Sequence, residues 1–236
     1  MKIADERLDN IYVAGTDTCA GKTVLSLLLM QFFYAKGIEP FYLKMVQTGC
    51  RDAYDIESDA RFIYENVSSL KGKDCAESVP YCFRNPKAPY FAARDQGVNI
   101  DLEVIKKAID KKNISFHPVI LEAAGGLLVP VTEKALIIDT IRIMEAGTLI
   151  AARAGLGTIN HTLLAIEALD KRGIRPLGVV FMDFGEKPTP QDMISENIEA
   201  VENVSGLKVA GVINKIKNFS NPAKNCYEPL IKIFGA

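Results

Sequence analysis

The segment Gly15-Thr16-Asp17-Thr18-Cys19-Ala20-Gly21-Lys22-Thr23 decides the fold of this 236-residue chain. Residues 11–14 precede it as an apolar run, which is typical of a buried strand, and residues 21–35 are predicted to form a helix. A glycine-bounded loop ending in Gly-Lys-Thr between a strand and a helix is the layout of a phosphate-binding loop. Glycines let several backbone N–H groups turn toward one anion, and the helix N-terminus adds partial positive charge.

The spacing inside this segment is unusual. Five residues separate Gly15 from Gly21, whereas the usual loop has four. Lys22 would supply a cation for the outer phosphates, and the hydroxyl of Thr23 would be a ligand for Mg²⁺. The alternative is a chance Gly-Lys-Thr in an ordinary turn, but the flanking strand and helix favour the phosphate loop.

Composition limits the classes of function. The chain is 48% hydrophobic and 24% charged with a formal net charge of −1, which favours one α/β domain over residues 1–236 and no nucleic-acid or membrane partner. Residues 1–7 are charged and lack an apolar signal core, so we expect a cytoplasmic protein. The five cysteines are odd in number and form no Cys-x-x-Cys pair, which argues against a zinc site or a disulfide framework.

Strand-like and helix-like patterns alternate along the rest of the chain. The predicted strands are 40–46, 118–122, 148–152, 177–182 and 208–213, and the further predicted helices are 55–65, 100–112, 137–145, 158–172 and 190–204. The strands are continuous apolar runs, as expected for a mostly parallel sheet with helices on both faces. This is the three-layer, P-loop NTPase-like fold class. Residues 67–99 are irregular and read as an excursion from the same domain.

Ligands of such sheets bind beyond the carboxyl ends of the strands. Lys44 ends one predicted strand and could reach the same phosphates as Lys22, although a solvated lysine would be the simpler interpretation of Lys44 alone. Glu122 ends another strand and could hold Mg²⁺, or could merely open a glycine turn. Asp59 could be a third metal ligand, or an acid that complements a helix dipole.

Five sequence blocks together resemble the dethiobiotin synthetase family, whose phosphate loop has the same additional residue. The blocks are the segment 15–23; Lys44 with Val46-Gln47-Thr48-Gly49; Ser58-Asp59-Ala60; Glu122 with Ala124-Gly125-Gly126; and Gly157 with Ile159-Asn160-His161. The resemblance implies an ATP- and Mg²⁺-dependent ligase of biotin biosynthesis. Such a ligase closes a cyclic urea from 7,8-diaminononanoate and CO₂ through a carbamate and a carbamic-phosphoric anhydride, and it works as a homodimer.

The resemblance also implies roles for individual residues. Catalytic roles fall to Lys44, Lys22 and Thr18, and Mg²⁺ ligation to Thr23, Asp59 and Glu122. The implied nucleotide contacts are Gly15, Thr16, Asp17, Cys19, Ala20, Gly21, Lys22, Thr23, Val24, Asp59, Glu122, Ala123, Ala124, Gly125, Met182 and Asp183. The implied substrate contacts are Thr48 and, across the dimer interface at a helix start, Gly157, Thr158, Ile159 and Asn160.

Met182 is the main departure from the family pattern, because many members have an asparagine there that reads the adenine base. A thioether lacks the paired donor and acceptor of an amide, so base selectivity stays open. Two alternatives also stay open: a P-loop enzyme of the cobyrinate-amidation type and a partitioning-type ATPase switch. As a rim lysine, Lys44 is expected to matter more for turnover than for stability.

Overall fold

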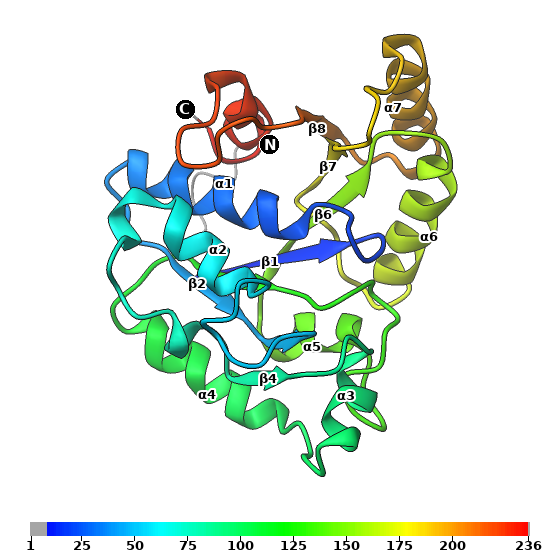
Figure 1. Cartoon of the computed structure of the whole chain (residues 1–236). Helices are drawn as coiled ribbons and strands as arrows, with labels where there is room; N and C mark the ends of the chain where they lie inside the picture. The colour runs from blue at the N-terminus through cyan, green and yellow to red at the C-terminus, as the bar shows by residue number, and fades with distance from the viewer. Residues whose placement is uncertain (1–8, 236) are drawn as a thin grey trace.

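The computed structural model describes residues 9–235 and is built on a six-stranded parallel sheet (Figure 1). The strand order is β2-β5-β1-β6-β7-β8, and every pair in it is parallel. The strands are β1 (Asn10–Gly15), β2 (Phe41–Lys44), β5 (Val119–Glu122), β6 (Gly147–Arg153), β7 (Gly178–Asp183) and β8 (Val209–Asn214). The charged residues 1–7, on which the cytoplasmic expectation depends, lie outside the described part.

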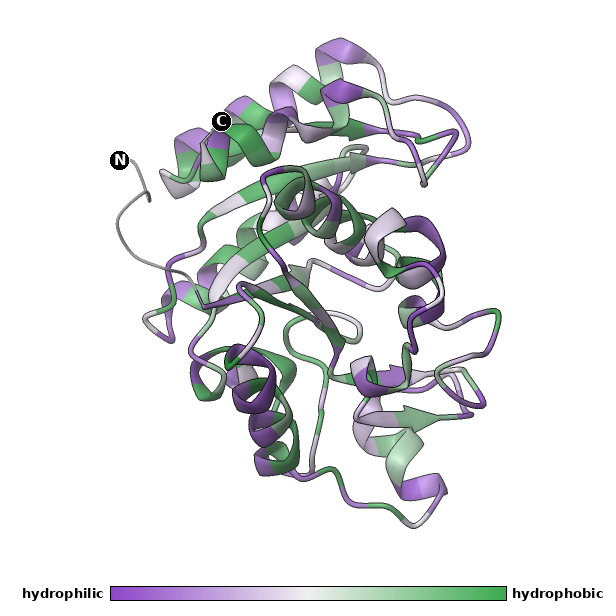
Figure 2. Cartoon of the chain, turned by 90° about the vertical axis from the view of Figure 1, so that its left-hand side faces the viewer, coloured by the Kyte–Doolittle hydropathy of each residue, from purple (hydrophilic) through white to green (hydrophobic). Residues whose placement is uncertain are grey.

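Both faces of the sheet are apolar because both are covered. In β1, Tyr12 and Ala14 belong to one buried cluster, whereas Ile11 and Val13 belong to a second cluster on the opposite face. Side chains alternate between the faces of a strand, so a doubly covered strand appears as an unbroken apolar run. The colouring of Figure 2 shows this distribution, with hydrophobic strands inside and hydrophilic outer helix surfaces.

Helices form the two outer layers. One face carries α1 (Lys22–Ala35), α2 (Asp59–Asn66) and α8 (Glu228–Phe234), and the other carries α4 (Leu102–Asn113), α5 (Ile137–Ile143), α6 (Thr158–Asp170) and α7 (Gln191–Ser205). The three-layer α/β class predicted from the sequence is therefore confirmed. The sequence analysis missed α8, whose seven residues are too short for a clear helical period.

The predicted strand 40–46 is wrong in one respect, because it is two strands in two sheets. β2 ends at Lys44, which pairs with Glu122 at the end of β5, so the main sheet has no partner for the chain beyond that point. The chain continues as β3 (Val46–Thr48), which pairs in parallel with β4 (Tyr81–Phe83). The excursion 67–99 thus supplies a small second sheet, followed by α3 (Pro89–Asp95).

The predicted helix 55–65 begins later than expected. Ser58 caps α2 by accepting a hydrogen bond from the backbone N–H of Arg61, which leaves Asp59 as the first helical residue. Asp55 accepts hydrogen bonds from the backbone N–H groups of Arg51 and Glu57. This local turn satisfies the backbone before the helix begins, and periodicity alone does not reveal it.

The remaining regular elements are short 3₁₀ turns, at Ser68–Leu70, Ala76–Ser78 and Lys224–Tyr227. Within residues 9–235, none of the helices has both the length and the apolar character that a membrane crossing requires.

Replacing a core side chain of the central strands should cost stability, because the surrounding layers cannot collapse into the space. Ile150 in β6 is fully buried, and Ile150→Ala should lower the free energy of unfolding by about 2–5 kcal/mol. Ile114 is 82% exposed, and Ile114→Ala should change the free energy of unfolding by less than about 0.5 kcal/mol. Urea unfolding followed by circular dichroism measures both, and similar values for the two variants would contradict the described core.

Candidate active site

The phosphate-loop segment 15–23 joins β1 to α1 at the carboxyl edge of the main sheet. Gly21 precedes α1 with a φ of +92°, a conformation that strains residues with a side chain. A Cβ at Gly21 would lie 2.7 Å from Cγ of Met182 in β7, so the close approach also requires glycine. The ammonium of Lys22 donates a hydrogen bond to the backbone carbonyl of Asp17 at 2.8 Å, which holds this lysine over the loop.

Lys22 is buried in a way that favours an anionic partner. Its side chain is 6% exposed, and burial, followed by the positive charge of Lys44, lowers the pKa of Lys22 to about 8. The carboxylates of Glu122 and Asp59 oppose this shift. An anion near the ammonium would favour the charged form, as phosphate does in this kind of loop.

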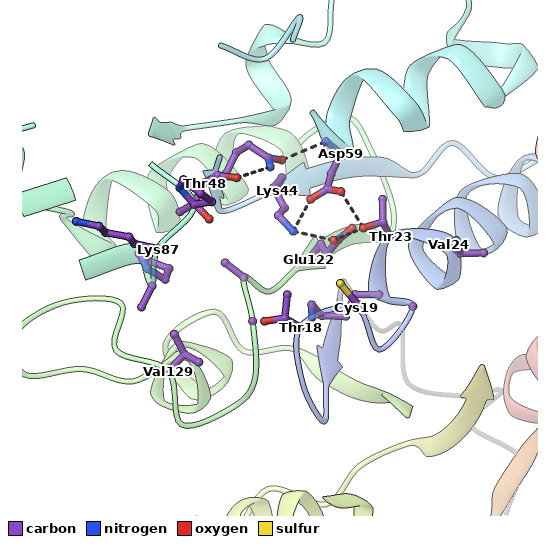
Figure 3. Close-up of a pocket in the computed structure, with 18 residues that line it drawn as sticks. Thr18, Cys19, Thr23, Val24, Lys44, Thr48, Asp59, Lys87, Glu122 and Val129 are labelled. Atoms are coloured by element: carbon purple, nitrogen blue, oxygen red, sulfur yellow. Dashed lines mark hydrogen bonds and ion pairs between the residues drawn. The ribbon is translucent and has the colours of Figure 1, made fainter. Parts of the chain in front are cut away.

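Lys44 lies between two carboxylates. Its Nζ is 2.7 Å from Oδ2 of Asp59 and 2.8 Å from Oε1 of Glu122, and its side chain points between them in Figure 3. Burial alone would lower the pKa of Lys44, but the two carboxylates outweigh burial and raise it. Burial alone would likewise raise the pKa of Asp59, but Lys44 and the hydroxyl of Thr23 hold it below its usual value. Lys44 is therefore charged and paired.

The hydroxyl of Thr23 connects the same two carboxylates. Its Oγ1 lies 2.9 Å from Oδ1 of Asp59 and 2.8 Å from Oε1 of Glu122. A hydroxyl has one hydrogen to donate, so these two oxygens share it. Two carboxylates and a hydroxyl are hard oxygen ligands of the kind that Mg²⁺ accepts, with phosphate oxygens and water to complete its coordination. The donor set thus fits a magnesium ion.

A cavity of about 590 Å³ brings most of the predicted site residues together (Figure 3). Its lining includes, from the predicted sets, Thr18, Cys19, Gly21, Lys22, Thr23, Val24, Lys44, Thr48, Asp59, Glu122, Ala124 and Gly125. The excursion 67–99 contributes a further wall, made of residues 86–89. The cavity therefore has an anion-binding end at the loop and a second end at the excursion.

Several predicted nucleotide contacts lie outside this cavity. Gly15, Thr16 and Asp17 line a neighbouring hollow of about 380 Å³, whereas Ala20 and Ala123 are fully buried. The backbone carbonyl of Ala123 accepts from Lys44 at 3.3 Å.

The two residues expected near the base are the last two residues of β7. Met182 is buried against Gly21, and the carboxylate of Asp183 accepts from the hydroxyl of Thr189 at 2.7 Å.

The predicted substrate helix is also separate from the cavity of its own chain. Gly157 precedes α6 with a φ of +90°, and Thr158 is buried with its hydroxyl 3.2 Å from that of Thr162. Ile159 is half-buried and Asn160 is exposed, and none of these residues lines the 590 Å³ cavity.

The sequence analysis gave no role to three further residues around the site. The side-chain carbonyl of Gln47 accepts from the backbone N–H of Asp59 at 3.1 Å and thus anchors the start of α2. Arg153 at the end of β6 donates to Oδ2 of Asp17 at 3.2 Å and to the carbonyl of Thr18 at 3.1 Å. The sequence did contain a signal for Arg153, because this residue directly follows the predicted strand 148–152, at the edge of the sheet where ligands bind. The third, Tyr42, lies two residues before Lys44 on the same strand face.

A strand, an anion cradle and a helix, with oxygen ligands at the carboxyl edge of a parallel sheet, define a P-loop nucleotide-binding protein. The sequence profile of the AAA domain matches residues 9–223, which agrees with this class.

The curated relatives are more specific. The chain is 38% identical over 202 residues to the ATP-dependent dethiobiotin synthetase BioD of Hydrogenobaculum sp., covering 80% of this chain and 86% of the relative. It is 32% identical over 212 residues to the ATP-dependent dethiobiotin synthetase BioD of Methanococcus vannielii, covering 89% of this chain and 95% of the relative. The chain belongs to the dethiobiotin synthetase family.

Solved structures agree on the fold alone. The MinC:MinD cell division protein complex of Aquifex aeolicus matches with a TM-score of 0.53 at 12% identity, covering 90% of this chain and 85% of that chain. A putative plasmid partition protein of Borrelia burgdorferi bound to AMPPNP matches with a TM-score of 0.54 at 12% identity, covering 97% of this chain and 98% of that chain. The partitioning and cobyrinate-amidation alternatives are not favoured, given the much higher identity to the synthetases.

The expectation that Lys44 contributes little to stability needs revision, because its side chain is buried with two carboxylates. Lys44→Ala would leave both carboxylates without their cation, and it should lower the free energy of unfolding by about 3–5 kcal/mol in the absence of divalent ions. Lys171 is an exposed lysine paired with Glu167 of α6, and Lys171→Ala is the matched control. It should change the free energy of unfolding by less than about 0.5 kcal/mol. Urea unfolding in EDTA measures the difference, and equal effects would contradict a buried ion cluster.

Proposed function

We propose that this protein closes the ureido ring of dethiobiotin from 7,8-diaminononanoate, CO₂ and ATP, acting as one synthetase domain in the cytoplasm. The observation that carries this proposal is the meeting of Lys22, Lys44 and two carboxylates in one cavity beside a phosphate loop. Membership of the dethiobiotin synthetase family supports the same activity.

The reaction suits residues that bind and orient rather than attack. One amine of the substrate adds to CO₂ and loses a proton, which forms a carbamate. A carbamate oxygen then attacks the γ-phosphorus of ATP and displaces ADP. The second amine attacks the carbamate carbon, inorganic phosphate leaves, and the ring closes. No protein nucleophile is needed, but charge on the transferring phosphoryl group must be neutralised.

Each cluster of residues has a part in this scheme. We assign the ammonium groups of Lys22 and Lys44 to the phosphates and the carbamate, and the hydroxyl of Thr18 to a phosphate or carbamate oxygen. Thr23, Asp59 and Glu122 would hold Mg²⁺, which supplies charge neutralisation across the outer phosphates. Lys44 lies between two of the residues that would hold the metal, and its ammonium is suited to neutralise charge on the carbamate.

The substrate is assigned to the other end of the cavity. Thr48 lines the cavity near the excursion and is suited to hydrogen-bond the diamine. The base of the nucleotide is assigned to the surroundings of Met182 and Asp183, as the family resemblance implies. Met182 packs on Gly21 of the phosphate loop, and Asp183 accepts a hydrogen bond from Thr189.

Phosphate release tests the proposed function directly. Purified protein with Mg²⁺, ATP and bicarbonate should release phosphate only when 7,8-diaminononanoate is present, and should form dethiobiotin in equal amount. Lys44→Ala, assayed where circular dichroism shows it folded, should lower kcat at least about 100-fold because it removes charge stabilisation, whereas Lys171→Ala should not. Release that responds only to lipid or DNA would indicate a switch ATPase, and release that needs a corrinoid and ammonia would indicate an amidation enzyme.

We also propose that two copies of the chain pair through the face that carries the start of α6. Leu156 is 94% exposed immediately before Gly157, and Leu164 and Leu128 are more than half exposed beside the 380 Å³ hollow. Free N–H groups at the start of α6 suit a carboxylate. Pairing would bring Gly157, Thr158, Ile159 and Asn160 of one copy to the cavity of the other and would cover the exposed leucines.

The assembly is tested by its mass in solution. The wild-type protein should sediment as a dimer, and Leu156→Asp should sediment as a monomer because it places a charge in the interface. Ile114→Asp changes a comparably exposed residue at the end of α4 and should leave the dimer intact. A monomeric wild-type protein, or a dimeric Leu156→Asp, would exclude this interface.

A further inference from the structure

Tyr42 is a buried polar group that the proposed reaction does not use. It lies in β2 two residues before Lys44, and alternate residues of a strand share a face, so both side chains approach the same edge of the site. Tyr42 is fully buried, and its hydroxyl donates a hydrogen bond to Oε2 of Glu122 at 2.8 Å. The phenol does not line the 590 Å³ cavity. Direct contact between Tyr42 and a substrate is therefore not the role to consider.

The partners of Glu122 show what this hydrogen bond does. Oε1 receives the hydroxyl of Thr23 and the ammonium of Lys44, both at 2.8 Å. Oε2 receives Tyr42. Glu122 itself is fully buried, so water is not at hand to replace a lost partner. Each carboxylate oxygen thus has a separate task, and a rotation of the carboxylate would break the bond to Tyr42.

We propose that Tyr42 is a positioning residue that acts through Glu122: it holds Oε2 and thereby presents Oε1 alone to the cation that Thr23, Asp59 and Glu122 would bind. The proposal rests on the magnesium site described under the proposed function. Groups that orient a metal-binding carboxylate by a hydrogen bond typically change metal affinity 10–100-fold when they are removed. A hydrogen bond from a neutral phenol to a buried carboxylate is also among the stronger ones.

Tyr42→Phe removes the hydroxyl and keeps the ring. Magnesium affinity is measured by calorimetry in the presence of a non-hydrolysable ATP analogue, and Mn²⁺ electron paramagnetic resonance gives a second readout. We expect Tyr42→Phe to weaken metal binding about 10-fold and to change the KM for the diamine less than about twofold, because Thr48 and the excursion are untouched.

Tyr12→Phe is the matched control. Tyr12 is equally buried, in strand β1, which β5 separates from β2. Its hydroxyl lies 2.7 Å from that of Thr140, on the opposite face of the sheet from Tyr42. The Tyr12→Phe variant loses a buried phenol hydroxyl that does not contact Glu122. Its metal affinity should therefore equal that of the wild type. Equal metal affinities for Tyr42→Phe, Tyr12→Phe and the wild type would overturn the proposal.

A double-mutant cycle with Glu122→Ala isolates the coupling. If Tyr42 acts through Glu122, Tyr42→Phe should have no additional effect on metal affinity in the Glu122→Ala background. If Tyr42→Phe unfolds because Oε2 is left unpaired, the double variant, which lacks that oxygen, should have a higher thermal midpoint than Tyr42→Phe alone. A double variant that melts no higher than Tyr42→Phe would count against the coupling. A wild-type protein whose nucleotide binding ignores Mg²⁺ would contradict the proposed metal site itself, which distinguishes that failure from the failure of Tyr42.

Discussion

Asp59 and Glu122 place two carboxylates around one hydroxyl, and the carboxylate of Glu122 is fully buried. Carboxylates this close repel each other, and an unpaired buried charge is costly. The ammonium of Lys44 offsets this repulsion, because its Nζ lies 2.7 Å from Oδ2 of Asp59 and 2.8 Å from Oε1 of Glu122. The geometry of the whole site depends on this ion cluster, because it joins β2, β5 and α2, and the hydroxyl of Thr23 adds α1.

The parallel sheet explains why these residues meet. Lys44 and Glu122 are the last register pair of neighbouring strands, so their side chains leave the sheet at the same edge. The loop after β1, which lies beside β5, opens at that edge as well. The chain can leave the main sheet after Lys44, and the excursion 67–99 then folds back to close the cavity from the other side.

Hydrogen bonds from residues in and around the cavity hold the elements that carry its charged groups. Gln47 anchors the start of α2, Arg153 ties the phosphate loop to the end of β6, and Tyr42 fixes one oxygen of Glu122. For a reaction in which the protein supplies orientation and charge rather than a nucleophile, such contacts also bear on the rate, because they position the charged groups.

Much of this protein follows from its sequence, because the signals involved are local. The segment 15–23 between a strand and a helix, and the unbroken apolar strands, predict the three-layer fold and the edge of the sheet where Lys44 and Glu122 lie. Tertiary structure alone decided that the chain breaks after Lys44, where the neighbouring strand offers no further partner. It also decided that Lys44 is buried between carboxylates instead of solvated at the rim, and that Met182 packs on Gly21 of the phosphate loop. Each of these outcomes depends on residues that are distant along the chain, and local periodicity contains no information about such pairings.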